Sequence, residues 1–266
     1  MRTLTRPTSL VAALALAVAA TGSSAASAQA PTTPPDVDPS TGGGTVTNAQ
    51  PVGGSALQLL SNERTLSRWA HPARLADIYQ RHSGRSLRVA RLRFFTEDGF
   101  PEVYLLLSRW TSPAGKEWVR IRIPKRPNGR TGWIPREALG PFNVVRTQLI
   151  VNRKTLRATL YERGRAIWSA RIGIGALGTP TPGGKFWIRE KFRFKDTPIY
   201  GTHALGTAAY APTLSDWPNG GVVGLHGTNQ PELIPGRPSH GCVRIRNDEI
   251  ARLYRLIPLG TPLLIR

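Results

Sequence analysis

Short apolar runs, each closed by a turn sequence, are the feature that most limits what this chain can fold into. In the first half of the chain these runs are Val89–Phe95, Val103–Leu107, Trp118–Ile123 and Thr131–Ile134. Runs of this length, with apolar and polar residues in alternation, are typical of half-buried strands. Glu97-Asp98-Gly99 lies between the first two runs and predicts a hairpin. Pro127-Asn128-Gly129 predicts a turn between the last two.

The second half of the chain repeats this pattern, and the protein is therefore predicted to be mainly β. The strands expected there are Gln148–Val151, Thr155–Tyr161, Ala166–Ile174 and Leu263–Ile265. Two stretches have helical character. Leu57–Tyr79 contains a possible helical piece, which Pro72 interrupts. Asp248–Leu256 is predicted as a short helix capped by Asn247, and the residues expected on its buried face are Ile250, Leu253 and either Leu256 or Ile257.

The amino-terminal segment is predicted to be processed rather than folded. Arg2 and Arg6 precede the apolar run Leu10–Ala20, and Ala28-Gln29-Ala30 forms a small-x-small cleavage site, so residues 1–30 are predicted to be a secretory signal peptide. Its removal leaves 266 − 30 = 236 residues, enough for two modest domains. Residues 31–54 are rich in Pro, Gly and Thr and are expected to be a disordered linker.

The rest of the chain divides into two predicted β domains, 55–142 and 143–266. The strands of the first end in Gly132-Trp133-Ile134-Pro135 and resemble a bacterial SH3-like barrel. Its Trp118 and Trp133 are expected to fill a small core rather than line a ligand groove.

A strong positive charge narrows the choice of partners. The formal net charge is +20, and loss of Arg2 and Arg6 with the signal peptide leaves 20 − 2 = +18. Such a field concentrates polyanions near the surface. For an exported bacterial protein, anionic wall polymers and phospholipid surfaces are better candidates than nucleic acid, although the charges are scattered and also fit an ordinary solvated surface. No stable membrane insertion is expected after signal cleavage.

The chemistry of the chain centres on its only cysteine. Cys242 has no partner for an internal disulfide, so it is either a buried structural thiol or a reactive one. His240 lies two residues before it and His226 sixteen residues before it, and glycines adjoin all three. A thiol, a candidate base and open backbone amides are the parts of a covalent acyl-transfer site.

Two other kinds of site are not supported. His203, His226, His240 and Cys242 lack the paired spacings of a convincing zinc site, so no metal and no cofactor is expected. Residues 178–186 superficially resemble a phosphate-binding loop, but two prolines remove amide donors and no Ser or Thr follows Lys185. This stretch is interpreted as a rigid turn between strands.

The segment from His226 to Arg244 resembles the catalytic motif of the L,D-transpeptidase family, whose catalytic domain is of the YkuD type. The matching residues are His226-Gly227-Thr228-Asn229, then Ser239-His240-Gly241-Cys242-Val243-Arg244 and Asn247, and the resemblance reaches back through 178–186. It implies a YkuD-type β-sandwich catalytic domain with a short helix over roughly Val144–Arg266.

The resemblance also implies roles for individual residues. Cys242 would be the nucleophile and His226 its general base, oriented by the backbone carbonyl of Gly227. Amides around Cys242, after Ser239, His240 and Gly241, would stabilise an oxyanion, and Arg244 would hold an acidic group of the substrate. His240 remains an alternative base, since residues two apart on a strand share a face. Arg244 could also be an ordinary surface cation.

The implied reaction is an exported L,D-transpeptidase reaction on peptidoglycan stem tetrapeptides. Cys242 would form an acyl-enzyme with release of D-alanine, and the side-chain amine of a second stem would accept the acyl group in a 3→3 cross-link. With water as the acceptor, the enzyme would be an L,D-carboxypeptidase. A papain-like peptidase is disfavoured because its cysteine precedes its histidine. A non-catalytic cell-wall-binding protein is disfavoured because both motifs are complete.

Overall fold

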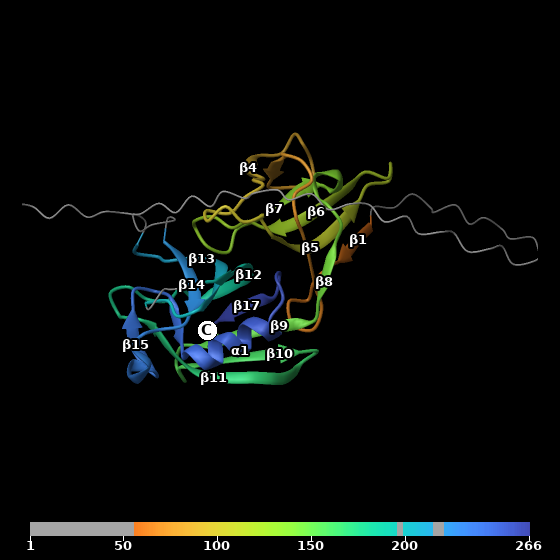
Figure 1. The fold of residues 1–266 in the computed structure, drawn as a ribbon. Coiled ribbons are helices and arrows are strands. Elements are labelled where there is room, and N and C mark those ends of the chain that lie inside the picture. Colours follow the sequence, from red (N-terminus) through yellow and green to blue (C-terminus); the bar gives the residue numbers. More distant parts are fainter. Residues whose placement is uncertain (1–55, 196–198, 215–220) are drawn as a thin grey trace, which may run out of the picture. The chain divides into compact units, whose positions relative to one another are not determined.

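The computed structural model describes residues 56–195, 199–214 and 221–266, and two β-sheets carry most of its regular structure (Figure 1). The predicted signal peptide (1–30) and the predicted linker (31–54) lie outside these residues. Within the described ranges, no helix has the length and apolar character needed to cross a membrane. The prediction of a mainly β protein is confirmed.

The first sheet occupies residues 56–145. Its strands are β1 (Ala56–Leu59), β2 (Ser67–Ala70), β3 (Asp77–Tyr79), β4 (Arg88–Arg91), β5 (Tyr104–Thr111), β6 (Glu117–Arg122), β7 (Thr131–Pro135) and β8 (Asn143–Val145). They lie in the order β4-β3-β7-β6-β5-β2-β8, with β1 paired to β5. Their shared core includes Ile78, Tyr104, Val119 and Ile134. Trp118 is buried and Trp133 half-buried. The SH3-like interpretation of this sheet stays a prediction.

The helical piece expected in Leu57–Tyr79 is wrong, because this stretch forms β1, β2 and β3. Asn62 explains the first reversal of the chain: its Oδ1 accepts hydrogen bonds from the amides of Arg64, Thr65 and Leu66 at 2.9–3.1 Å. A side chain that binds the following amides competes with helix formation.

The predicted hairpin around Glu97-Asp98-Gly99 is only partly present. The amide of Thr96 donates to the carbonyl of Phe100, so the chain does reverse there. The flanking strands do not pair, however, since β4 pairs with β3 and β5 with β1, β2 and β6. The carboxylates of this loop are used elsewhere, because Glu97 and Glu102 both bind Arg189 of the second sheet.

The second sheet is built from the described residues between 147 and 265. Its strands are β9 (Thr147–Asn152), β10 (Arg157–Glu162), β11 (Arg165–Gly175), β12 (Gly184–Arg193), β13 (His203–Tyr210), β14 (Val222–His226), β15 (Gly236–Ser239), β16 (Val243–Ile245) and β17 (Pro262–Ile265). The order is β10-β9-β17-β12-β13-β14-β16-β11-β15, and β10 also pairs with β11. The sheet therefore folds back on itself around one apolar core. The turn predicted at 178–186 overlaps the connection from β11 to β12, residues 176–183, but its last three residues belong to β12.

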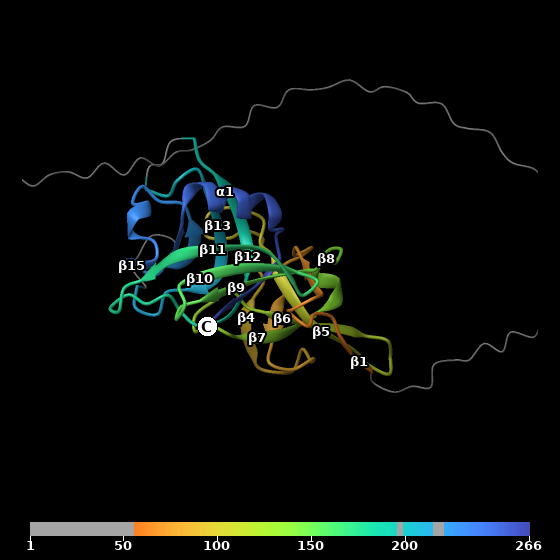
Figure 2. The ribbon, with the colours of Figure 1, turned by 90° about the horizontal axis from the view of Figure 1, so that it is seen from below.

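The single α-helix of the described residues, α1 (Asn247–Leu256), packs against β13 and β14 (Figure 2). Ile250, Leu253 and Ile257 are buried and Leu256 is exposed, so Ile257 completes the apolar face. The prediction that Asn247 caps the helix is wrong: Arg246 is the cap residue and makes no side-chain capping bond. The side chain of Asn247 binds a neighbouring loop instead.

Buried contacts join the two sheets. Val103 and Leu105 of the first sheet pack with Trp187 and Ala208 of the second. The indole Nε1 of Trp187 donates to the carbonyl of Val103 at 2.7 Å. Trp187 and Ala208 adjoin core residues such as Ile188 and Ala209 along β12 and β13, so their side chains lie on the face opposite the apolar core. The first sheet covers part of that face.

Candidate active site

The neighbouring parallel strands β14 and β16 bring the candidate nucleophile and base to one face of the second sheet. Leu225 pairs with Val243, and His226 pairs with Arg244. Leu225 and Val243 are buried in the core. Because successive side chains on a strand point to opposite faces, His226 and Arg244 point away from this core, as does Cys242, which immediately precedes β16.

The thiol of Cys242 is half-buried beside a glycine. The amide of Gly224 donates to Sγ at 3.4 Å. Burial raises the pKa of the Cys242 thiol, while the Gly224 amide and the positive charge of Arg244 oppose this shift. The thiol is consequently protonated at neutral pH before substrate arrives, so its reactivity depends on a base that removes the proton during attack.

His226 is held in the tautomer that a general base requires. Its Nδ1 donates to the carbonyl of Gly227 at 2.6 Å, which leaves Nε2 as the proton acceptor. Burial lowers the pKa of His226 to about 4, the Gly227 bond opposes this shift, and Arg244 adds to it. The imidazole is therefore neutral at pH 7. The ring of Tyr200 packs edge-on against it, with ring centroids 4.9 Å apart.

Two hydroxyl groups fix the backbone that carries Cys242. Ser239 Oγ donates to the Cys242 carbonyl at 2.6 Å and accepts from the Gly241 amide at 3.2 Å. Thr181 Oγ1 donates to the Gly241 carbonyl at 2.7 Å and accepts from the Gly175 amide at 2.9 Å. The Gly241 carbonyl shares a peptide plane with the Cys242 amide, so Thr181 also fixes the direction of that N–H group.

The Gly227 carbonyl lies in a loop that α1 holds in place. Asn247 Oδ1 accepts from the Thr228 amide at 2.8 Å, and its Nδ2 donates to the Thr228 carbonyl at 3.0 Å. A Cβ atom on Gly227 would approach Asn247 Oδ1 to 2.2 Å, so the fit depends on glycine. The sequence motif included Asn247, but no feature of the sequence indicated this role.

Most of the predicted site residues line one cavity of about 320 Å³. His226, Ser239, His240, Cys242 and Arg244 all line it, together with Tyr200, Ala211 and Leu214. Gly227 and Gly241 are not among the lining residues. The Gly227 carbonyl accepts a hydrogen bond from His226, and the Gly241 carbonyl accepts one from Thr181. His203 is not part of the cavity, since its ring packs against Tyr254 of α1, with centroids 4.8 Å apart.

Arg244 and His240 occupy the rim of this cavity. Arg244 Nη1 donates to Gln230 Oε1 at 2.9 Å, whereas its buried Nε has no hydrogen-bond partner among the described residues. A guanidinium on the cavity lining is suited to bind an anionic group of a ligand. His240 is exposed at the same opening.

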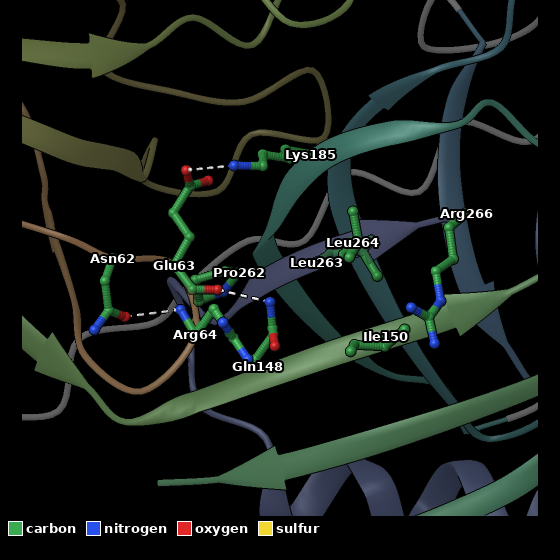
Figure 3. A pocket seen from close by; sticks show the side chains of 10 residues that line it. All are labelled: Asn62, Glu63, Arg64, Gln148, Ile150, Lys185, Pro262, Leu263, Leu264 and Arg266. Carbon is green, nitrogen blue, oxygen red and sulfur yellow. Dashed lines mark hydrogen bonds and ion pairs between the residues drawn. The ribbon is translucent and has the colours of Figure 1, made fainter. Parts of the chain in front are cut away.

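A second cavity, of about 270 Å³, lies between the first sheet's Asn62–Arg64 segment and strands β9, β12 and β17 (Figure 3). Glu63 pairs with Lys185 across it, and the Gln148 amide donates to the Glu63 carbonyl. Its lining contains no histidine or cysteine among the described residues, so it offers no nucleophile and base for acyl transfer.

Comparison with known proteins places this site in a described family. Residues 146–265 match the YkuD family, the L,D-transpeptidase catalytic domain. The chain is 31% identical over 161 residues to the probable L,D-transpeptidase ErfK/SrfK of Salmonella typhimurium, covering 54% of this chain and 50% of that protein. It is 31% identical over 127 residues to the putative L,D-transpeptidase YqjB of Bacillus subtilis, covering 44% of this chain and 69% of that protein.

These matches are partial. The chain spans half the length of the ErfK/SrfK relative, and residues 56–145 lie outside the family match. Among solved structures, the catalytic domain of the E. faecium L,D-transpeptidase is 26% identical with a TM-score of 0.34, covering 45% of this chain and 96% of that chain.

Proposed function

The chain belongs to the L,D-transpeptidase family through its YkuD catalytic domain, and from this premise we propose that it transfers acyl groups between peptidoglycan stem peptides through a Cys242 acyl-enzyme. The observation that carries the proposal is the shared cavity of Cys242 and His226, in which the Gly227 carbonyl leaves His226 Nε2 free to accept a proton.

The reaction begins with a neutral thiol and a neutral imidazole. As Sγ attacks the carbonyl carbon of the diamino-acid residue, His226 Nε2 takes the thiol proton, and the carbonyl becomes a tetrahedral oxyanion. The backbone amides around Cys242 are the candidate donors to this oxyanion. When the intermediate collapses, the bond to D-alanine breaks, His226 returns the proton to the departing amine, and a thioester remains on Cys242.

The second half of the reaction decides the product. If the side-chain amine of another stem attacks the thioester, it loses a proton to His226, the C–S bond breaks and a 3→3 cross-link forms. If water attacks instead, the product is a shortened stem and the enzyme acts as an L,D-carboxypeptidase. We propose cross-linking as the main outcome, with Arg244 holding a carboxylate of the stem and Ser239, His240 and Gly241 shaping the opening.

The setting proposed for this reaction is the bacterial cell envelope. It is supported by the predicted signal peptide at 1–30 and by the net charge of +20, which favours anionic wall polymers as partners. The SH3-like interpretation of residues 55–142 and the catalytic assignment of 143–266 belong to the same proposal. Binding to the wall without catalysis is the alternative.

The experiment uses the mature protein with a stem tetrapeptide, and separately with a carbapenem. We expect release of D-alanine, a cross-linked dimer of stems, and an adduct mass on Cys242. Cys242→Ala and His226→Ala should abolish turnover, whereas His203→Ala, a matched histidine on the neighbouring strand, should retain it. Shortened stems without dimers would assign the carboxypeptidase reaction. Wall binding without turnover would support the non-catalytic alternative, and full turnover by His226→Ala would refute the assigned base.

A further inference from the structure

One wall of the active-site cavity is attached to the first sheet. Ala211 and Leu214, which follow β13, line the cavity that contains Cys242. Their carbonyl groups point away from it toward the loop after β6. Arg126 in that loop donates from Nη2 to the Ala211 carbonyl at 2.8 Å and to the Leu214 carbonyl at 3.1 Å. A single guanidinium therefore fixes two points of the wall.

A second side chain of the same loop holds the residue at the start of the wall. Asn128 Nδ2 donates to the Tyr210 carbonyl at 2.8 Å, and its Oδ1 accepts from the Tyr210 amide at 3.1 Å. The Tyr210 hydroxyl, which donates to the Glu97 carboxylate, also lies 2.9 Å from the Pro124 carbonyl oxygen. The Arg126 guanidinium also lies 5.1 Å from the centre of the Tyr210 ring. Residues 124–128 thus bind residues 210–214 at several points.

Close packing transmits this attachment to the nucleophile. A Cβ atom on Gly241 would lie 3.7 Å from the Ala211 methyl group, so Ala211 abuts the turn that carries Cys242. On the other side, a Cβ atom on Gly221 would lie 1.9 Å from the Leu214 carbonyl oxygen and 3.0 Å from Arg126 Nη2. The position of Ala211 and Leu214 therefore has little freedom while the Arg126 bonds are present.

The bonds of Arg126 and Asn128 are not the only contacts between the two sheets. A buried cluster of Val103, Leu105 and Trp187 also joins the sheets. So does the buried ion pair between Glu102, just before β5, and Arg189 of β12. Arg126 and Asn128 bind the backbone at the end of β13 and in the segment after it, of which Ala211 and Leu214 line the cavity. Loss of their bonds is expected to move the wall without separating the sheets.

We propose that Arg126 and Asn128 are positioning residues for the substrate cavity, so that the first sheet builds part of the site at which the stem peptide binds. This inference rests on the proposed function for its substrate, but not for its geometry. It predicts that the catalytic domain depends on the loop 124–128 for the affinity of its donor substrate, although no residue of this loop takes part in the reaction.

The test compares Arg126→Gln, Arg126→Lys and Asn128→Ala with a matched control, Arg136→Gln. Arg136 is also part-buried and donates to a backbone carbonyl, that of Leu139. Both residues lie between β7 and β8 of the first sheet, so this bond does not reach the second sheet. We expect the three loop variants to raise KM for the stem tetrapeptide by about fivefold with a smaller change in kcat, as fits the loss of one or two hydrogen bonds. Lysine should not rescue, because it lacks the planar guanidinium that lies over the Tyr210 ring while Nη2 donates to both carbonyls.

A second readout does not require turnover. The rate at which Cys242 is alkylated is measured with iodoacetamide and with the bulkier fluorescein maleimide. The loop variants should change the ratio of the two rates at least about threefold. Arg136→Gln should keep the wild-type ratio, and all four variants should keep an unfolding temperature near that of wild type. Unchanged ratios in the loop variants, or the same change in Arg136→Gln, would overturn the inference. If Cys242 of the wild-type protein is alkylated but no stem peptide is turned over, the proposed function fails. The ratio of the two alkylation rates still tests the positioning role of Arg126 and Asn128.

Discussion

The side-chain amide of Asn247 bonds both the amide and the carbonyl of Thr228, so the first turn of α1 holds the loop that orients His226. This loop supplies the Gly227 carbonyl, which determines the imidazole tautomer. A helix residue thereby holds the group that orients His226, the proposed base. If the proposed roles of Cys242 and His226 hold, the Gly227 carbonyl is the orienting third member of a triad, and the Asn247 amide holds it in place.

Replacing Asn247 should therefore impair catalysis more than folding. We expect Asn247→Ala to lower kcat/KM for the stem tetrapeptide by about tenfold, because a misplaced base loses much of its contribution to proton transfer. Asn247→Asp should be impaired as well, since its second oxygen would face the Thr228 carbonyl. The matched control is Asn152→Ala, which removes bonds to the amides of Lys154 and Thr155 in a turn between β9 and β10. Equal losses in both variants would contradict the assigned role.

The sequence predicted many of the strands, and it indicated candidate site residues that line one cavity, because both leave local signals. Alternating apolar residues indicated strands such as β6 and β9, and the neighbours of Cys242 formed a long motif. The contacts made by Asn247, Thr181 and Arg126 left no such signal, because each joins segments distant in the chain, 19 residues apart for Asn247 and 85 for Arg126. Around Glu97, the predicted hairpin extends only as far as the Phe95–Pro101 bridge, and Glu97 also binds Arg189 of the other sheet, 92 residues away.

The pH dependence of the reaction should reflect a neutral thiol and a neutral imidazole. Burial lowers the pKa of His226 to about 4 and raises the pKa of Cys242. The base is neutral above its pKa, so kcat/KM should be nearly constant from about pH 5.5 to 8 and fall below that range as His226 is protonated. Alkylation of Cys242 by iodoacetamide should be slow at neutral pH and rise in the alkaline range. Rapid alkylation near pH 5 would instead indicate a preformed thiolate–imidazolium pair.

Arg244 should shift this profile in a defined direction. Its positive charge lowers the pKa of both His226 and Cys242. Arg244→Gln removes the charge, so both pKa values should rise, the acid limb of kcat/KM should move to higher pH, and KM for the stem should increase. Arg246→Gln is the control, because Arg246 donates to the Ile234 carbonyl and is not among the residues that line the cavity. An acid limb that moves to lower pH would contradict the electrostatic role.

Thr181 is expected to act on the orientation of the Cys242 amide. Thr181→Val keeps the shape but leaves the Gly241 carbonyl and the Gly175 amide without their partner, at a cost of about 1–3 kcal/mol in unfolding free energy. Acylation by the carbapenem should also slow by about tenfold or more, because a displaced oxyanion donor stabilises the transition state less. Thr181→Ser retains the hydroxyl, so its unfolding free energy and its rate of acylation should be close to those of wild type. Normal acylation by Thr181→Val would separate Thr181 from the oxyanion site.

Glu190 should make the stability of the protein depend on pH. This residue of β12 is 2% exposed, and its Oε1 has no hydrogen-bond partner among the described residues. Burial raises the pKa of Glu190 to about 7; Asp98 and Glu102 add to this, while a Thr96 hydrogen bond and Arg189 oppose it. Asp98, which hydrogen-bonds Glu190, has its own pKa raised by burial and by Glu97. Two bonded carboxyl groups need one shared proton.

The sign follows from proton binding in the two states. Between the ordinary carboxyl pKa and about 7, the folded protein retains a proton that the unfolded chain has lost, so this group's contribution to stability falls as pH rises. The total loss is at most about 3 kcal/mol. Glu190→Gln is neutral throughout, so its unfolding free energy should lack this fall between about pH 5 and 8. Glu137→Gln, at an exposed carboxylate paired with Arg74, should behave like wild type. A Glu190→Gln variant with the same pH dependence as wild type would show that the shared proton has no effect on stability.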